Sequence, residues 1–308
     1  LPLDTENDPF HRAHPMPKPL IIDTDLGVDD ALAIMLACAS PELEPICLTS
    51  VSGNVDVDTA TDNLLRLSAY LGPRPMPVVA RGAETPLEKA AEHATFLHGA
   101  DGLGGASGEL HEPRGDTAPR LAPENAARTI IEHIERAPVP PVLVALGPLT
   151  NLALAERETP GILRRLDRLV VMGGAVTVSG NISPAAEFNF YADPLAAHIV
   201  LDSGAPVTLA GLDVTRQARL RREDLDACPD TPRTRLVKRI TSAIFDHALE
   251  TTGQESTPLH DPLAVAVAFW PELCGTEELS LRVETRGDIG EGMSLADRRL
   301  VLPHLKSP

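Results

Sequence analysis

Features that mark several common protein classes are scarce or missing in this sequence of 308 residues. Four cysteines are present, at positions 38, 47, 228 and 274, and they form no Cys-x-x-Cys pair. Neither a zinc site of that type nor a thioredoxin-like pair is therefore indicated, and we expect free, buried thiols. The sequence has no run of about 18 apolar residues, so no membrane-spanning segment is predicted.

Positive charge and aromatic side chains are also in short supply. The 27 Lys and Arg residues stand against 44 Asp and Glu residues, which gives a formal net charge of −17. Because polyanions bind to clustered basic residues, this balance argues against a nucleic acid as the main partner. Aromatic residues make up 3% of the chain and hydrophobic residues 43%, so we expect an aliphatic, alanine-rich core.

The N-terminal segment differs in composition from the rest of the chain. Its first 19 residues are polar and rich in proline, unlike the apolar centre of a secretory signal. We expect residues 1–19 to be a poorly ordered extension and residues 20–308 to form one domain of a cytoplasmic protein.

The remaining chain alternates short apolar runs with longer amphipathic ones, which is typical of βαβ units. This pattern predicts an α/β fold with a mostly parallel central sheet covered by helices on both faces. The predicted strands are 20–25, 46–51, 77–81, 142–146, 169–172, 207–211 and 281–285. The predicted helices lie near 29–39, 59–71, 124–136, 149–157, 194–203, 233–251 and 262–270.

Four carboxylates occur within eight residues, where the first predicted strand meets the first predicted helix. They are Asp23, Asp25, Asp29 and Asp30. In open α/β sheets ligands bind beyond the carboxyl ends of the strands, which is where these side chains are expected. Carboxylates brought together repel one another, so the cluster favours a cation site, and oxygen-only ligands suit Ca²⁺ better than zinc. A single aspartate here would be read as a helix cap.

Asp-x-Asp after a strand also begins phosphatases of the haloacid dehalogenase type. In that alternative, Asp23 would be the nucleophile and Asp25 the acid/base, although the doubled Asp29-Asp30 is not part of that pattern.

Three other segments carry side chains suited to chemistry. Each also has an ordinary explanation: a turn former at Asn189, a helix N-cap at Asp261 and a surface histidine at His98. The segments are Glu187-Phe188-Asn189 with Asn181 upstream, His260-Asp261-Pro262, and the glycine-rich loop around His98.

Together these segments resemble the inosine–uridine preferring nucleoside hydrolases from about Leu20 to Arg298. The resemblance rests on an ordered series of motifs: DTDLGVDD (23–30), SGN (52–54), GPLTN (147–151), MGG (172–174), AEFNFYADP (186–194), GLDVT (211–215), HDP (260–262) and GMSLAD (292–297). It implies a single nucleoside hydrolase-like domain that cleaves ribonucleosides to ribose and free base. The family usually continues after Arg298 with another strand and helix, so the C-terminal element is expected to be shortened.

The resemblance also implies a role for each matching position. It implies that Asp25, Asp30, Asp261 and the carbonyl of Leu146 bind a calcium ion together with a water, and that Asp25 activates this water. It implies that Asp29, Asn54, Asn181, Glu187 and Asn189 bind the ribose hydroxyls, with Met172 in the pocket wall. His260 is expected to face the leaving base as a general acid, and His98 to border the site.

General chemistry agrees with these roles. Cleavage of an N-glycosidic bond passes through a ribosyl cation, so it needs a nucleophile on one face and a stabilised leaving group on the other. Calcium lowers the pKa of a bound water less than zinc does, so a carboxylate base is still required.

One region departs from the family. The stretch 241–252 carries Phe245 and His247 where the family often has tyrosines, so the choice between purine and pyrimidine stays open. A non-catalytic nucleoside- or sugar-binding protein is therefore a second alternative. We expect a nucleoside as the partner molecule, no nucleic acid or membrane, and a homodimer or homotetramer.

Overall fold

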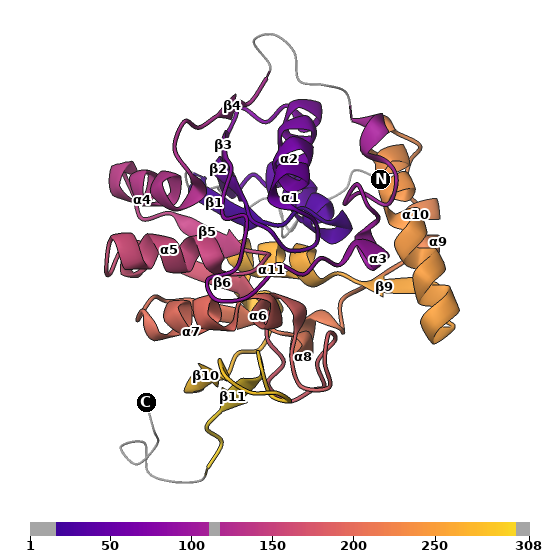
Figure 1. Ribbon diagram of the computed structural model, residues 1–308. Helices are drawn as coiled ribbons and strands as arrows, with labels where there is room; N and C mark the ends of the chain where they lie inside the picture. The colour runs from indigo at the N-terminus through magenta and orange to yellow at the C-terminus, as the bar shows by residue number, and fades with distance from the viewer. Residues whose placement is uncertain (1–16, 111–117, 300–308) are drawn as a thin grey trace, which may run out of the picture.

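The computed structural model describes residues 17–110 and 118–299. Its centre is a seven-stranded sheet in the order β4-β3-β2-β1-β5-β6-β7, and every neighbouring pair is parallel (Figure 1). The prediction of a mostly parallel sheet is confirmed. In that order the strands span Arg120–Leu121, Val78–Ala80, Leu43–Ser50, Lys18–Thr24, Val142–Ala145, Arg168–Met172 and Val207–Ala210.

Helices cover both faces of this sheet. One face, with Leu20 and Ile22 of β1, packs against α1 (Val28–Ala39), α2 (Val57–Leu71) and α11 (His260–Phe269), and α10 (Pro232–Thr252) packs against α1 at the edge of this layer. The other, with Ile21 of β1, packs against α4 (Ala126–Arg136), α5 (Thr150–Glu158) and α7 (Pro194–Asp202). Because alternate residues of each strand face opposite sides, both faces need apolar side chains, which explains the nearly continuous apolar runs.

The strand order places a crevice beside β1. The chain builds β2, β3 and β4 outward on one side of β1 and then returns to build β5, β6 and β7 on the other. The helices that follow β1 and β5 therefore lie on opposite faces, and this topology predicts a crevice at the carboxyl ends of the two strands.

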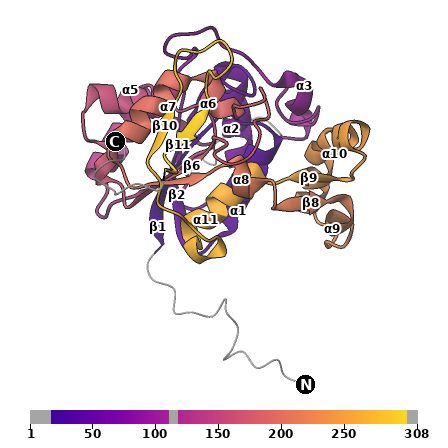
Figure 2. The ribbon, with the colours of Figure 1, turned by 90° about the horizontal axis from the view of Figure 1, so that it is seen from below.

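Short elements complete the fold around this edge. Figure 2 shows α9, α10, β8 and β9 projecting to one side of the main body. The short elements are α3 (Thr95–His98), α6 (Phe188–Ala192), α8 (Leu212–Thr215), β8 (Arg219–Arg221), α9 (Arg222–Asp226), β9 (Ser256–Pro258), β10 (Leu281–Val283) and β11 (Ser294–Ala296).

Three details differ from the sequence prediction. The predicted strand 281–285 lies outside the main sheet, because β10 pairs antiparallel with β11 and the seventh strand of the sheet is the two-residue β4. Helix α11 begins at His260, so Asp261 lies in its first turn and is not its N-cap. All four cysteines are free, but only Cys47 is buried and Cys228 is exposed.

Two boundary observations concern the ends of the domain. Strand β1 begins at Lys18, and residues 1–16 of the predicted extension lie outside the described residues. Among the described residues, no helix has the length and apolar character that crossing a bilayer requires.

The Asn151 side chain hydrogen-bonds to three separate segments near the carboxyl edge of the sheet. Its side-chain amide donates hydrogen bonds to Asp23 Oδ1 at 2.7 Å and to the Ser50 carbonyl at 2.8 Å. Its oxygen accepts a hydrogen bond from the Ala83 amide at 2.9 Å. Asn151, Asp23 and Ser50 are buried in the core, where lost hydrogen bonds are not replaced by water. Asp23 Oδ1 accepts a second hydrogen bond from Thr49.

We expect Asn151→Ala to lower the free energy of unfolding by about 3 kcal/mol, because it removes one hydrogen bond from a buried carboxylate and one from a buried carbonyl. Urea denaturation measures this loss. Arg157→Ala, at an exposed position of the same helix, is the matched control. Equal stability of the two variants would show that the Asn151 bonds contribute nothing.

Candidate active site

A cavity of about 470 Å³ opens at the carboxyl edge of the sheet. Its wall includes residues that follow β1, β2, β5 and β6, so it occupies the crevice that the strand order creates. Ten of the twelve site residues predicted from the sequence line it: Asp29, Asn54, His98, Leu146, Met172, Asn181, Glu187, Asn189, His260 and Asp261. The other two, Asp25 and Asp30, are fully buried and hydrogen-bond to Asn54 in the wall.

The turn between β1 and α1 is strained. Leu26 has a φ of 28°, a conformation that residues with a side chain rarely adopt. Gly27 follows, and a Cβ at this position would lie 2.5 Å from Nδ1 of His98 and 2.7 Å from Nδ2 of Asn54. The turn therefore needs glycine so that the two side chains can reach the start of α1.

Carboxylates from distant parts of the chain meet at this turn. Oxygen atoms of Asp29, Asp30 and Asp261 lie within 4.8 Å of one another. Asp261 reaches the group because α11 packs along α1, so the first turns of the two helices are adjacent. Asp25 adjoins the group through Asn54, whose side-chain amide lies 3.2 Å from Asp25 Oδ1 and 3.2 Å from Asp30 Oδ2.

Without a positive charge beside them, these carboxyl groups are unfavourable in their ionised form, because they are buried and repel one another. Burial raises the pKa of Asp25 well above its ordinary value, and the charge of Asp30 raises it further. Burial and then the charge of Asp29 do the same to the pKa of Asp261. The pKa of Asp29 is raised to about 7 by burial and by Asp30. The group as a whole therefore resists carrying its full negative charge.

A hard cation fits this arrangement. Asp29 Oδ1 is buried and has no hydrogen-bond partner, and no Lys or Arg among the described residues lies within ion-pair distance of the four aspartates. The three clustered aspartates offer oxygen ligands only, and Leu146 lines the same cavity. Buried carboxylates without a basic partner are typical of a site for a divalent ion that prefers oxygen ligands.

The opposite wall of the cavity is a polar surface built on α6. Glu187 caps this helix by accepting hydrogen bonds from the amides of Asn189 at 2.9 Å and Phe190 at 3.2 Å. The Asn189 side chain donates to the carbonyls of Leu146 at 2.7 Å and Met172 at 3.2 Å. Burial raises the pKa of Glu187, and three or more backbone amides oppose that shift. The wall therefore offers fixed, oriented polar groups.

Asn181 joins this wall from a preceding loop. Its side-chain oxygen accepts a hydrogen bond from the Phe188 amide at 2.9 Å, which fixes the loop to the start of α6. Together with Asp29 and Asn54 on the opposite side, the wall presents carboxylate and amide groups to one space, which suits a ligand with several hydroxyl groups.

Two histidines line the cavity between these walls. His98, at the end of α3, accepts a hydrogen bond at Nδ1 from the Val28 amide at 3.0 Å. His260 Nδ1 lies 2.7 Å from Thr215 Oγ1. Burial lowers the pKa of His98 to about 4, and burial followed by the positive charge of Arg216 does the same for His260. Both rings are therefore neutral at pH 7 and can offer their other nitrogen to a ligand.

Asp23 does not join the carboxylate group. Its side chain hydrogen-bonds to Thr49 at 2.5 Å and to Asn151, and burial raises its pKa to about 7. It is fully buried, and neither it nor these two partners line the cavity. This placement argues against the phosphatase alternative, in which Asp23 is the nucleophile that must reach a substrate.

The sequence analysis did not single out two cavity residues, Arg216 and Arg219. They follow the GLDVT motif by one and four residues, and this proximity to a motif was the only signal that could have identified them.

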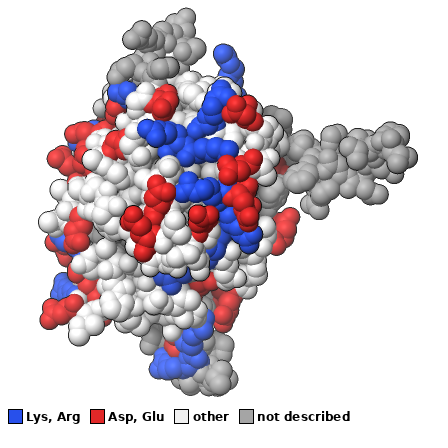
Figure 3. Space-filling model, turned by 90° about the vertical axis from the view of Figure 1, so that its right-hand side faces the viewer, with Lys and Arg blue, Asp and Glu red and all other residues white. Residues whose placement is uncertain are grey.

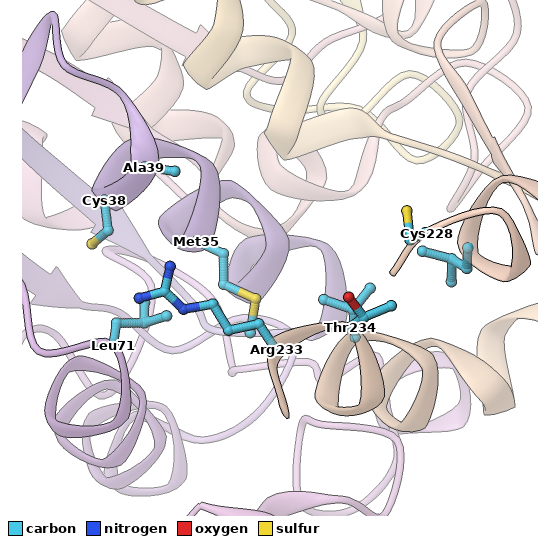
Figure 4. A pocket seen from close by; sticks show the side chains of 9 residues that line it. Met35, Cys38, Ala39, Leu71, Cys228, Arg233 and Thr234 are labelled. Carbon is cyan, nitrogen blue, oxygen red and sulfur yellow. The ribbon is translucent and has the colours of Figure 1, made fainter. Parts of the chain in front are cut away.

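A second, smaller cavity lies elsewhere. Its volume is about 230 Å³, and it lies at the far end of α1 from the carboxylates, against α10 (Figure 4). Its lining is mostly apolar and carries a single charged residue, Arg233. The lining residues are Met35, Cys38, Ala39, Leu71, Leu225, Cys228, Arg233, Thr234 and Val237.

Comparison with known proteins supports an enzyme site. The family model described as inosine-uridine preferring nucleoside hydrolase matches residues 20–307. The pyrimidine-specific ribonucleoside hydrolase RihA of Citrobacter koseri is 41% identical over 92% of this chain and 89% of its own length.

Solved structures agree with this match. A plant nucleoside hydrolase superposes with a TM-score of 0.86 at 34% identity, covering 94% of this chain and 90% of its own. The purine-preferring ribonucleoside hydrolase of Gardnerella vaginalis superposes with a TM-score of 0.82 at 34% identity, covering 91% and 89%.

Gly53 limits the space around Asp25, because a Cβ at this position would lie 2.1 Å from Asp25 Oδ2. We expect Gly53→Ala to displace this carboxylate and to lower the affinity for a divalent cation by about tenfold. Calorimetric titration with Ca²⁺, the ion expected from the sequence, measures this change. Gly108→Ala is the matched control, since nothing lies within 4 Å of the added methyl group. Unchanged affinity in Gly53→Ala would mean that the position of Asp25 does not matter for the ion.

Proposed function

The chain belongs to the inosine–uridine preferring nucleoside hydrolase family, and we propose that it hydrolyses ribonucleosides with a calcium ion bound by its aspartates and with Asp25 as the base. The observation that carries this proposal is the meeting of Asp25, Asp30 and Asp261 beside a wall of carboxylate and amide groups. Both are needed for the proposed reaction. Asp261 and the polar wall line one cavity of about 470 Å³. Asp25 and Asp30 lie behind Asn54 of its lining.

The ribose is proposed to lie between the two polar walls. Asp29 and Asn54 would bind hydroxyl groups from one side, and Asn181, Glu187 and Asn189 from the other, with Met172 beside the ring. These side chains are held by backbone hydrogen bonds or by the close packing of the turn, so little freedom is lost when the sugar binds. Binding energy from the hydroxyl groups can then lower the barrier at the anomeric carbon.

Asp25, Asp30, Asp261 and the Leu146 carbonyl would hold the calcium ion. The bound ion would supply a positive charge that orients the attacking water and makes it more acidic. The raised pKa values of Asp25 and Asp261 support this assignment, because a cation removes the repulsion that raises them.

The proposed reaction breaks the bond between the anomeric carbon and the base nitrogen. The electron pair of that bond stays on the base, and a water oxygen forms the new bond to carbon. Asp25 takes one proton from the water and releases it to solvent, and the departing base takes up one proton from solvent, so that Asp25 is regenerated. Both oxygens of Asp25 accept hydrogen bonds from Asn54, which fixes the carboxylate in place for this transfer.

His260 is proposed to hydrogen-bond to the departing base through its Nε2 atom. Thr215 holds the other ring nitrogen, so the ring has a fixed orientation in the cavity wall. His98 would border the same space from α3. Because RihA proteins of about 40% identity are named pyrimidine-specific, uridine and cytidine are the first substrates to test, with inosine for comparison.

We expect the protein to release ribose and free base from uridine, measured by a reducing-sugar assay and by chromatography of the base. Asp25→Asn should lower kcat by about 10³-fold, within the usual range for loss of a general base. Asp202→Asn, at an exposed position, is the control and should keep full activity.

Two other results would contradict the proposed function. Release of phosphate from p-nitrophenyl phosphate without release of ribose would favour a phosphatase. Binding of uridine, cytidine and inosine without any product would favour a non-catalytic binding protein. Thermal unfolding of each variant checks that a loss of activity is not a loss of fold.

We expect a saturating concentration of Ca²⁺ to raise the Tm of the metal-depleted protein by about 5 °C, because ligand at 100 times its Kd stabilises by about 2.7 kcal/mol. The shift should disappear in Asp261→Asn and remain in Asp202→Asn, measured by scanning calorimetry. A shift of equal size in both variants would place the ion elsewhere.

A further inference from the structure

The lining of the large cavity changes in charge from one part to another. The carboxylates and amides described above line one part, beside the carboxyl edge of the sheet. Two arginines, Arg216 and Arg219, line another part, which is formed by the segment after α8, by β8 and β9 and by α10. If the ribose occupies the acidic part, the base extends toward the arginines.

Both guanidinium groups are held in place by uncharged partners. Arg219 donates hydrogen bonds to the Ser256 hydroxyl at 2.9 Å and to the Ser256 carbonyl at 2.8 Å. Arg216 donates to the Gly180 carbonyl at 2.8 Å and to the Ser179 hydroxyl at 3.3 Å. A guanidinium has five N–H donors, so each side chain keeps donors free for a ligand.

Arg216 and Arg219 differ from Arg222 and Lys238, two nearby basic residues that form ion pairs. Figure 3 shows that basic and acidic side chains mix on the side of the molecule that carries α9 and α10. There, Arg222 lies 2.8 Å from Asp246, and Lys238 lies 2.8 Å from Asp226. No carboxylate of the described residues lies within ion-pair distance of Arg216 or Arg219. In a chain with a net charge of −17, unneutralised cations in a cavity wall point to an anionic ligand.

We propose that Arg216 and Arg219 form the base-binding end of the cavity and select ribonucleosides whose base carries a negative charge, such as a pyrimidine with a ring carboxylate. This inference rests on the proposed function, since it places the ribose in the acidic part of the cavity. Arg219 determines the selectivity by direct contact with the anionic group. Arg216 also fixes the 179–180 backbone next to Asn181, so it positions the sugar wall as well.

An anionic group could also come from a phosphate on the ribose 5′ oxygen. The geometry favours the base, because Arg219 is anchored to Ser256 on β9, next to α10, whereas the sugar wall is built on α6 and the loop before it. The two sources place the negative charge on different parts of the substrate, the base or the 5′ phosphate, so substrates that carry only one of these charges separate them.

The test compares uridine, orotidine and uridine 5′-monophosphate. Orotidine differs from uridine only by a carboxylate on the base, and the nucleotide differs only by the phosphate. The ratio of kcat/KM for orotidine to that for uridine is measured in the unmodified protein and in Arg219→Gln, Arg219→Lys and Arg221→Gln. Arg221, two residues away on β8, does not line the cavity and is the matched control.

We expect the unmodified protein to prefer orotidine to uridine. Arg219→Gln should lower this preference about fivefold, the upper range for a contact between solvent-exposed charges. Arg219→Lys should keep most of the preference because it keeps the charge, and Arg221→Gln should keep all of it. A preference for uridine in the unmodified protein, or an equal ratio in Arg219→Gln, would overturn the proposal. So would an Arg219-dependent preference for the nucleotide.

Calorimetric binding separates this inference from the proposed function. If neither nucleoside is hydrolysed, the proposed function fails, and the Kd values of orotidine and uridine in the same proteins still decide the selectivity. Tighter binding of orotidine that depends on Arg219 would support the base-binding end. Equal binding of the two nucleosides would overturn it.

Discussion

The repulsion among buried carboxylates is the constraint on which the rest of this structure depends. Asp25, Asp30 and Asp261 come from two ends of the domain and are each almost completely shielded from water. Such a group is stable only if the fold around it is rigid and a positive charge can enter. The fold supplies the rigidity: β1 is the central strand, α11 lies along α1, and the turn between β1 and α1 accepts a positive φ at Leu26. The same rigid edge holds the polar wall on α6.

Much of this arrangement could be predicted from the sequence, because its strongest signals are local. Apolar runs of four to eight residues identified six strands of the main sheet, and the parallel sheet rule then placed Asp25 and its neighbouring carboxylates at one edge. The motif resemblance added Asn54 and Leu146. The motif resemblance also identified Asp261 as a member of the same predicted site, which no local sequence pattern could have linked to Asp30. Its position depends on how α11 packs on α1, and helix packing is a property of the whole core.

What the sequence did not reveal depends on long-range partners. Strands β8 and β9 have three residues each and pair across about thirty positions of chain, which is too short for a periodic signal. Arg216 and Arg219 reach the cavity only because of that pairing and because Gly180 and Ser256 anchor them. Asp23 was expected among the clustered carboxylates, but its partners Thr49 and Asn151 lie on a neighbouring strand and at the start of α5, so it faces the sheet interior.

Asn54 stands between the two halves of the site, since its backbone amide and side chain bond to Asp25 and its side chain also bonds to Asp30. A sugar hydroxyl that hydrogen-bonds to the Asn54 side chain would weaken the hydrogen bonds of this side chain to Asp25 and Asp30. An ion bound by the two carboxylates would weaken the same hydrogen bonds. Binding of one ligand would therefore change the affinity for the other, which is heterotropic cooperativity. Thermodynamics then requires the effect to be mutual: the factor by which a bound cation would alter nucleoside affinity equals the factor by which the nucleoside would alter cation affinity.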